Sequence, residues 1–138
     1  MNAKRVEARW SDDRLLGAVW ARAYGALDSA YRAHPGAAEQ PARLAARDSV
    51  YARTRRELVD SIAPRFGAID PRYAARVRLD NAALLARRIY STGLDDFDAV
   101  FVREGNPVNL AVERIIGLAK SRPDAPGVAV REWAGIAR

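Results

Sequence analysis

Apolar side chains recur every three or four residues along almost the whole chain, and this spacing limits the fold more than any other feature of the sequence. In the first such stretch Leu16, Trp20, Ala23, Leu27 and Tyr31 fall on one face of a helix. Alternation with a period of two, which is typical of a half-buried strand, is scarce. The sequence therefore predicts an all-α fold, a bundle of four or five helices.

Prolines, glycines and capping residues divide this pattern into segments. We expect helices over 12–33 (with Ser11 as N-cap), 41–63, 71–92, 96–104 and 107–122, and the third segment is either one helix or two with a break near Asp80. Gly93 would end that segment, and Asn106 and Pro107 would begin the last helix. After residue 122 the helical signal weakens. The predicted domains are a helical domain over 1–122 and a C-terminal tail over 123–138 that packs on it through Trp133.

The chain of 138 residues contains no cysteine and one histidine, His34. It therefore has no disulfide or thiolate zinc site, and it lacks the two or three imidazoles that most catalytic zinc sites use. The H-E-x-x-H, G-x-S-x-G, P-loop and G-x-G-x-x-G motifs are also absent. His34 precedes Pro35 and Gly36, a context that favours a role at a helix end. We expect no cofactor and no catalytic residue in this chain.

Three acids at 95, 96 and 98 have oxygen ligands that suit a hard cation, but the spacing lacks the glycine and distal glutamate of a calcium loop. We interpret them as first-turn residues of a helix, where acids stabilise the dipole. No apolar run is long enough to span a membrane, and no apolar signal region follows the N-terminus. The default expectation is a cytoplasmic location, unless the chain is a fragment of an envelope enzyme.

Basic charge is concentrated in the first two thirds of the chain. Residues 1–94 hold 17 basic and 10 acidic side chains, a net charge of +7, whereas 6 and 7 give residues 95–138 a net charge of −1. Such a cluster of arginines can bind phosphates or an acidic partner, and it can also be the solvated face of a helix, with pairs such as Arg56 and Asp60. The solvated face is favoured because no nucleic-acid-binding motif accompanies the charge. The candidate anion- or partner-binding residues are Arg43, Arg47, Arg53, Arg55 and Arg56.

Residues 79–84 read Leu-Asp-Asn-Ala-Ala-Leu and are followed by Tyr90, Leu94, Phe97, Gly105 and Leu110. This arrangement resembles the C-terminal segment of a bacterial family of predicted zinc aminopeptidases, which reads approximately L-N-N-A-x-L. Upstream, residues 44–58 with Arg43, Arg47, Tyr51 and Arg55 are similar to the charged helix of that family. The likeness spans about residues 12–122.

The resemblance implies the C-terminal helical region of such an enzyme, or a stand-alone relative without the catalytic part. No catalytic or metal-binding residue carries over, because the family's H-E-x-x-H lies in a region that this chain does not contain, and Asp80 replaces the first asparagine of the motif. Asn81 matches the motif, and an amide within an apolar run is expected to cap a helix or hold a neighbouring segment.

The first functional hypothesis is a non-catalytic packing or interaction domain. Its partner would be another protein or the missing catalytic region, and an oligomer is compatible with the sequence. The alternative is a small basic module that binds nucleic acid. A third interpretation, an enzyme in its own right, would require zinc-dependent activity from this chain alone.

Overall fold

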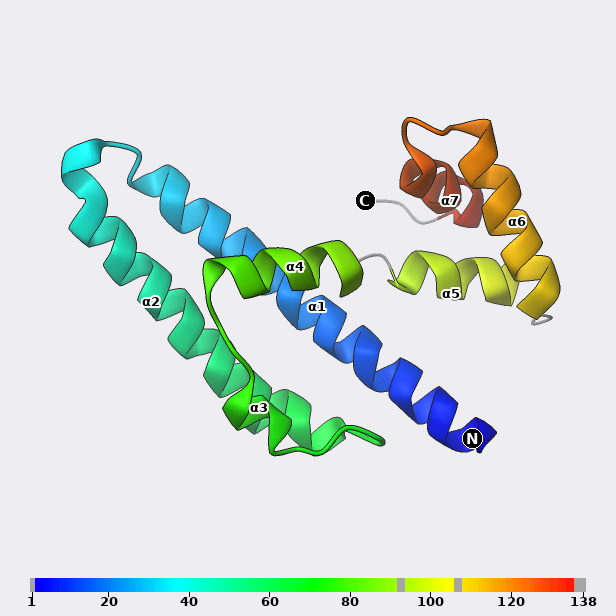
Figure 1. Cartoon of the computed structure of the whole chain (residues 1–138), viewed down its shortest axis with the longest axis horizontal. Helices are drawn as coiled ribbons and strands as arrows, with labels where there is room; N and C mark the ends of the chain where they lie inside the picture. The colour runs from blue at the N-terminus through cyan, green and yellow to red at the C-terminus, as the bar shows by residue number, and fades with distance from the viewer. Residues whose placement is uncertain (1, 92–93, 106–107, 136–138) are drawn as a thin grey trace. The chain divides into compact units, whose positions relative to one another are not determined.

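The computed structural model describes residues 2–91, 94–105 and 108–135. These residues form no strand, so the predicted all-α class is confirmed (Figure 1). Their α-helices are α1 (Ala3–Ala33), α2 (Gln40–Glu57), α3 (Tyr73–Arg76), α4 (Asn81–Ser91), α5 (Leu94–Arg103), α6 (Val108–Ser121) and α7 (Pro126–Ala134). The number of helices is higher than the predicted four or five. The segment 71–92 forms two helices, and the predicted tail forms another. Gly93, Asn106 and Pro107, which we predicted as helix ends, lie outside the described residues.

The chain divides into two compact units, Met1–Thr92 and Gly93–Arg138. The predicted division into 1–122 and 123–138 differs from this one. Helices α5, α6 and α7 bury Val100, Ala111 and Val130 against one another, so the C-terminal segment belongs to a unit that begins thirty residues earlier than predicted. The segment is also helical over Pro126–Ala134, and Pro126 occupies the first turn of α7, where a missing N–H costs nothing.

In the first unit α1 and α2 form an antiparallel hairpin that a short 3₁₀ turn, Ala37–Glu39, connects (Figure 1). Helix α1 begins earlier than predicted, since Asn2 is its N-cap and accepts a hydrogen bond from the backbone N–H of Lys4 at 3.1 Å. Ser11 therefore lies inside the helix, and Asp12 is not a first-turn acid but a buried side chain. Pro41 lies in the first turn of α2, as predicted.

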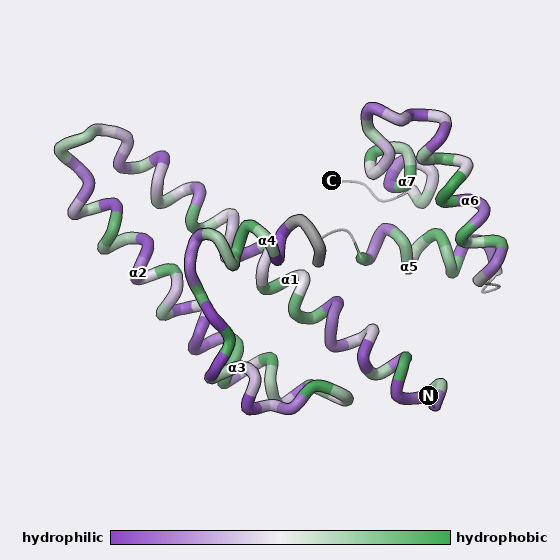
Figure 2. Tube along the Cα trace, viewed as in Figure 1, coloured by the Kyte–Doolittle hydropathy of each residue, from purple (hydrophilic) through white to green (hydrophobic). Residues whose placement is uncertain are grey.

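The core of the first unit lies between α1, α2 and α4. Figure 2 shows hydrophobic residues interspersed among hydrophilic ones along α1 and α2. Val19 and Trp20 of α1, Leu58 at the end of α2, and Leu84 of α4 are almost fully buried. The guanidinium of Arg87 lies 5.0 Å from the centroid of the Trp20 ring, and that of Arg88 lies 3.9 Å from the Tyr24 ring. These cation–π contacts add to the apolar packing of α4 on α1.

Helix α2 does not end in a regular α-turn. Residues Leu58–Ile62 form a π-helical turn, in which the N–H of Ala63 donates to the carbonyl of Leu58, and a 3₁₀ turn, Ala63–Arg65, follows. Leu58 and Ile62, at the two ends of this turn, are both buried in the core. The chain then enters the predicted loop between Pro64 and Pro71.

Asp12 holds this loop against α1. Its carboxylate accepts hydrogen bonds from the backbone N–H groups of Gly67 at 2.9 Å, Ala68 at 2.8 Å and Ile69 at 2.8 Å. The loop lies so close to α1 that a Cβ atom on Gly67 would be 3.2 Å from the Cβ of Ala8. Burial by itself raises the pKa of the Asp12 carboxyl, but the three backbone hydrogen bonds and nearby Arg9 lower it further, so the pKa lies below its ordinary value.

In the second unit Trp133 of α7 contacts two arginines. The guanidinium of Arg103 is 4.5 Å from the indole centroid and that of Arg114 is 4.9 Å from it. Asp96, in the first turn of α5 as predicted, is largely buried and pairs with Arg131 at 3.0 Å. Within the described ranges no group of three or more acidic or histidine side chains is arranged to bind a metal. Among the same residues no helix combines the length and apolar character needed to cross a bilayer.

Candidate docking groove

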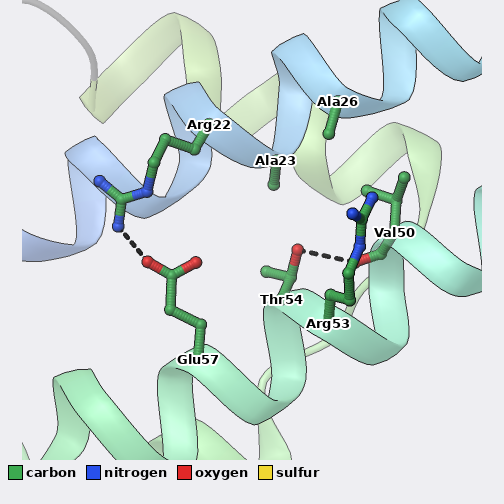
Figure 3. A pocket seen from close by; sticks show the side chains of 7 residues that line it. All are labelled: Arg22, Ala23, Ala26, Val50, Arg53, Thr54 and Glu57. Carbon is green, nitrogen blue, oxygen red and sulfur yellow. Dashed lines mark hydrogen bonds and ion pairs between the residues drawn. The ribbon is translucent and has the colours of Figure 1, made fainter.

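A groove runs along the surface of the hairpin between α1 and α2. One hollow of about 720 Å³ extends to His34, and an adjoining hollow of about 210 Å³ extends to Arg22 and Glu57. The two hollows share Ala26, Val50 and Arg53, so they form one continuous groove. Figure 3 shows the smaller hollow, with Arg22, Ala23 and Ala26 from α1 facing Val50, Arg53, Thr54 and Glu57 from α2.

The groove exists because small side chains line its floor. Along α1 the lining alanines are 23, 26, 30 and 33, which share one helix face because they are three or four residues apart. Ala46, Ser49 and Val50 line the α2 side. Methyl and hydroxymethyl groups do not fill the space between two helix backbones at the surface, so a channel remains between them.

The hydroxyl groups in the groove bond to their own helices. Ser29 donates to the carbonyl of Gly25 at 3.0 Å, Ser49 to that of Ala45 at 3.1 Å and Thr54 to that of Val50 at 2.9 Å. The hydroxyl hydrogens are thereby directed at helix carbonyls. The hydroxyl oxygens can still accept hydrogen bonds, so the groove presents both methyl groups and polar atoms to an incoming molecule.

A polar contact lies at each end of the groove. At one end Arg22 of α1 pairs with Glu57 of α2 (Figure 3). At the other end His34 is the C-cap of α1, and its backbone N–H donates to the carbonyl of Tyr31 at 3.2 Å. The His34 Nδ1 atom lies 3.6 Å from a carboxylate oxygen of Glu39. The structure thus places His34 at a helix end.

Arg53 and Arg56 lie on the α2 edge of the groove, and both are exposed. Within the described part of the chain neither guanidinium has an ion-pair or hydrogen-bond partner. The predicted pairing of Arg56 with Asp60 does not form. Asp60 lies in the π-helical turn that begins at Leu58, so it no longer follows Arg56 by one regular α-turn.

The other three candidate arginines bond within the chain. Arg43 donates to the backbone carbonyls of His34 and Gly36 at the end of α1. Arg47 pairs with its neighbour Asp48 at 2.9 Å. Arg55 donates to the carbonyls of Ala74 at 2.7 Å and Val77 at 2.5 Å, around the C-terminal end of α3. The five arginines therefore do not form a single binding surface, and only Arg53 and Arg56 face the groove.

Asn81 links α4 to both helices of the hairpin. Its side-chain carbonyl accepts a hydrogen bond from the hydroxyl of Tyr51, and its amide donates to the hydroxyl of Tyr31 at 2.9 Å. Burial raises the pKa of the Tyr51 hydroxyl, and the nearby Tyr31 raises it to a smaller extent. The hydroxyl therefore stays protonated and can donate. This contact does not border the groove.

Asp80 precedes α4 and accepts a hydrogen bond from the backbone N–H of Ala83 at 2.8 Å. That bond, followed by one from Arg78, lowers the pKa of the Asp80 carboxyl. Aspartate and asparagine are about equally good N-caps. The aspartate at position 80, where the family motif has asparagine, is therefore compatible with a helix that begins here.

Sequence reasoning missed the groove itself. The spacing of the four alanines in α1 was visible, but a run of alanines on one helix face is equally typical of a tightly packed helix contact. Comparison of the chain with protein-family models, with curated proteins and with solved structures gives no match.

Proposed function

We propose that this chain is a non-catalytic helical interaction domain, and that the groove between α1 and α2 binds an acidic amphipathic helix of a protein partner. The observation that carries the proposal is the position of Arg53 and Arg56, two exposed guanidinium groups without partners in the described residues, beside a channel of small side chains.

The shape of the groove favours a helix as ligand. A channel between two antiparallel helices takes a third helix whose larger side chains enter the spaces above the alanines. Apolar side chains of the partner would then pack on the alanine methyl groups that line the groove.

The charge of the groove favours an acidic partner. Arg53 and Arg56 are three residues apart on α2, so their side chains are neighbours on the helix surface. Carboxylates on successive turns of a partner helix would each meet a guanidinium, which binds a carboxylate through two parallel hydrogen bonds. The other ionisable side chains at the ends of the groove contact each other in two pairs. Arg22 pairs with Glu57, and His34 lies close to Glu39.

The resemblance to the C-terminal region of predicted zinc aminopeptidases suggests one such partner, a catalytic region of that family. The lone histidine and the absence of cysteine support a non-catalytic role for this chain. Hydrolysis of an amino-acid arylamide by the purified chain in the presence of zinc, lost on chelation, would refute that role.

Peptide binding tests the groove directly. The probes are two synthetic amphipathic helices with leucines on one face, flanked by glutamates in one and by lysines in the other, and anisotropy of a labelled peptide reports binding to the full chain. We expect the glutamate peptide to bind and the lysine peptide not to bind. Arg53→Glu with Arg56→Glu should weaken the glutamate peptide at least tenfold, about 1.4 kcal/mol.

Two control variants separate the groove from general charge and surface effects. Arg5→Glu with Arg65→Glu makes the same change in net charge at exposed positions that do not line the groove, and binding should remain. Ser49→Trp fills the groove and should abolish binding, whereas Ala21→Trp, at an exposed position of α1 outside the groove, should not. If the groove variants and the control variants weakened peptide binding equally, the groove would not be the binding site.

Nucleic acid is the second candidate ligand, because the same two arginines and the net charge of +7 on residues 1–94 would attract phosphates. Titration with duplex and single-stranded oligonucleotides at two salt concentrations distinguishes the candidates. Tight binding that falls steeply with salt and is lost in the Arg53→Glu, Arg56→Glu variant would favour the nucleic-acid function over the peptide-binding function.

A further inference from the structure

Among the described residues of the second unit, the apolar core is small. Its buried side chains are Val100, Ala111 and Val130, and Phe101, Ile115, Leu118, Trp133 and Ala134 are partly buried around them. Units of this length seldom bury enough apolar surface to be stable alone. Further apolar burial on the surface of this unit would therefore stabilise it.

Helix α6 carries an apolar stripe that the unit does not cover. Val112 and Ile116 are four residues apart on one face, and each is 48% exposed. Ala111 and Ile115, one position earlier, face the core of the unit. The stripe thus continues the core-facing surface of α6 outward, which is where a further helix would pack.

Two side chains of opposite charge lie along one side of the stripe. Glu113 and Lys120 are seven residues apart, two helical turns or about 10.5 Å along the axis. Both are exposed, and neither has an ion-pair or hydrogen-bond partner within the ranges that the structure covers. Arg114, next to Glu113, is already paired with Glu104 at 2.7 Å.

We propose that α6 is a self-association face, through which two copies of this chain pair antiparallel about a twofold axis. In an antiparallel pair the charges at 113 and 120 are self-complementary, since Glu113 of each copy lies opposite Lys120 of the other. The twofold axis then passes between residues 116 and 117. This register brings the two Ile116 side chains together at the centre, with the Val112 side chains on either side.

This symmetry explains why the partner is a second copy. An isologous interface requires one patch that complements itself, and an apolar centre with one acid and one base on opposite sides of the axis meets that requirement. Glu113 and Lys120, two helical turns apart and of opposite sign, supply that acid and base.

Charge reversal tests the register. Sedimentation equilibrium of the full chain over a range of concentrations gives the dimer dissociation constant. Glu113→Lys and Lys120→Glu each convert two attractions into two repulsions, and each should weaken the dimer about tenfold. The double variant restores opposite charges across the axis and should return the dissociation constant to near the wild-type value. The single variants change net charge in opposite directions, so a general charge effect cannot weaken both.

A second pair of variants tests the stripe. Ile116→Asp should abolish the dimer, whereas Val102→Asp, at an exposed valine on α5, should leave it unchanged. Circular dichroism of each variant checks that the helices are retained. A chain that is monomeric at every concentration, or a double variant as weak as the single ones, would overturn the proposal.

Discussion

We expect removal of the Asp12 carboxylate to destabilise the first unit strongly, although the local sequence around Asp12 does not show that this side chain is buried. Asp12 lies in the N-terminal third of α1 and is 1% exposed. Its two oxygens accept three hydrogen bonds from consecutive backbone N–H groups of the loop, at 2.8 to 2.9 Å. Asp12→Ala leaves these donors without an acceptor and removes the link between the loop and α1.

The expected loss follows from the number and type of these bonds. A hydrogen bond to a charged group contributes about 1.5–3 kcal/mol when both groups are buried. The loop amides are only partly buried and can bond to water in the variant, so the three contributions are less than additive. We expect Asp12→Ala to lower the free energy of unfolding by about 3 kcal/mol. For a unit of this size that lowers the melting temperature by about 12–24 °C.

Thermal and urea unfolding, followed by far-ultraviolet circular dichroism, measure this loss. Asp13→Ala is the matched control, because Asp13 is adjacent in sequence but forms only an exposed pair with Arg9 at 3.1 Å. It should cost less than about 0.5 kcal/mol. Asp12→Asn retains one acceptor oxygen and should fall between the two. Equal melting temperatures for Asp12→Ala and Asp13→Ala would refute the argument.

The same contact predicts a pH dependence of known sign. The pKa of Asp12 is lower in the folded chain than its ordinary value, so the folded state favours the ionised carboxylate. This contribution is complete above the unfolded pKa of about 3.9 and is lost as the pH falls through the folded pKa. The stability difference between wild type and Asp12→Ala should therefore be constant from pH 7 to about pH 5 and shrink below about pH 4. A difference that grows with acid would contradict this assignment.

Three further changes test the packing of the first unit, each by urea unfolding followed by circular dichroism. Trp20→Ala removes a ring that is 2% exposed and should cost about 3–5 kcal/mol, and an unchanged midpoint would exclude it from the core. Asn81→Ala removes the two tyrosine hydrogen bonds that hold α4 and should cost about 1 kcal/mol; no loss would show that α4 is held by apolar contacts alone. Arg55→Ala removes two hydrogen bonds to carbonyls near α3 and should cost about 1.5–3 kcal/mol. Arg53→Ala should change the stability by no more than about 0.5 kcal/mol. Equal losses would contradict the different roles of the two arginines.

The helical class followed from local information. The spacing of Leu16, Trp20, Ala23 and Leu27 places them on one face in any α-helix, and all four are buried in the core. Pro41 and Pro126 are tolerated only near helix starts, and both occupy first turns. The start of α1 was misplaced because Ser11 and the following acids look like a cap, while the side chain that caps the helix is Asn2.

The sites did not follow from local information. The arginines at 43, 47, 53, 55 and 56 have the same side chain and similar neighbours in sequence, yet three bond to groups within the chain and two remain at the groove. What separates them is the position of backbone carbonyls and acids that other segments bring near. Asp12 is a similar case, since its partners are 55 to 57 residues away.

The sequence by itself determined that this protein is helical, which face of α1 is apolar, and that basic charge gathers in residues 1–94. Only the tertiary structure decided that the chain has two compact units, that a groove opens between α1 and α2, and which arginines remain at its edge. The physical reason is the range of the interactions. Helix periodicity depends on residues three or four positions apart, whereas hydrogen bonds and grooves depend on which distant segments the fold brings together.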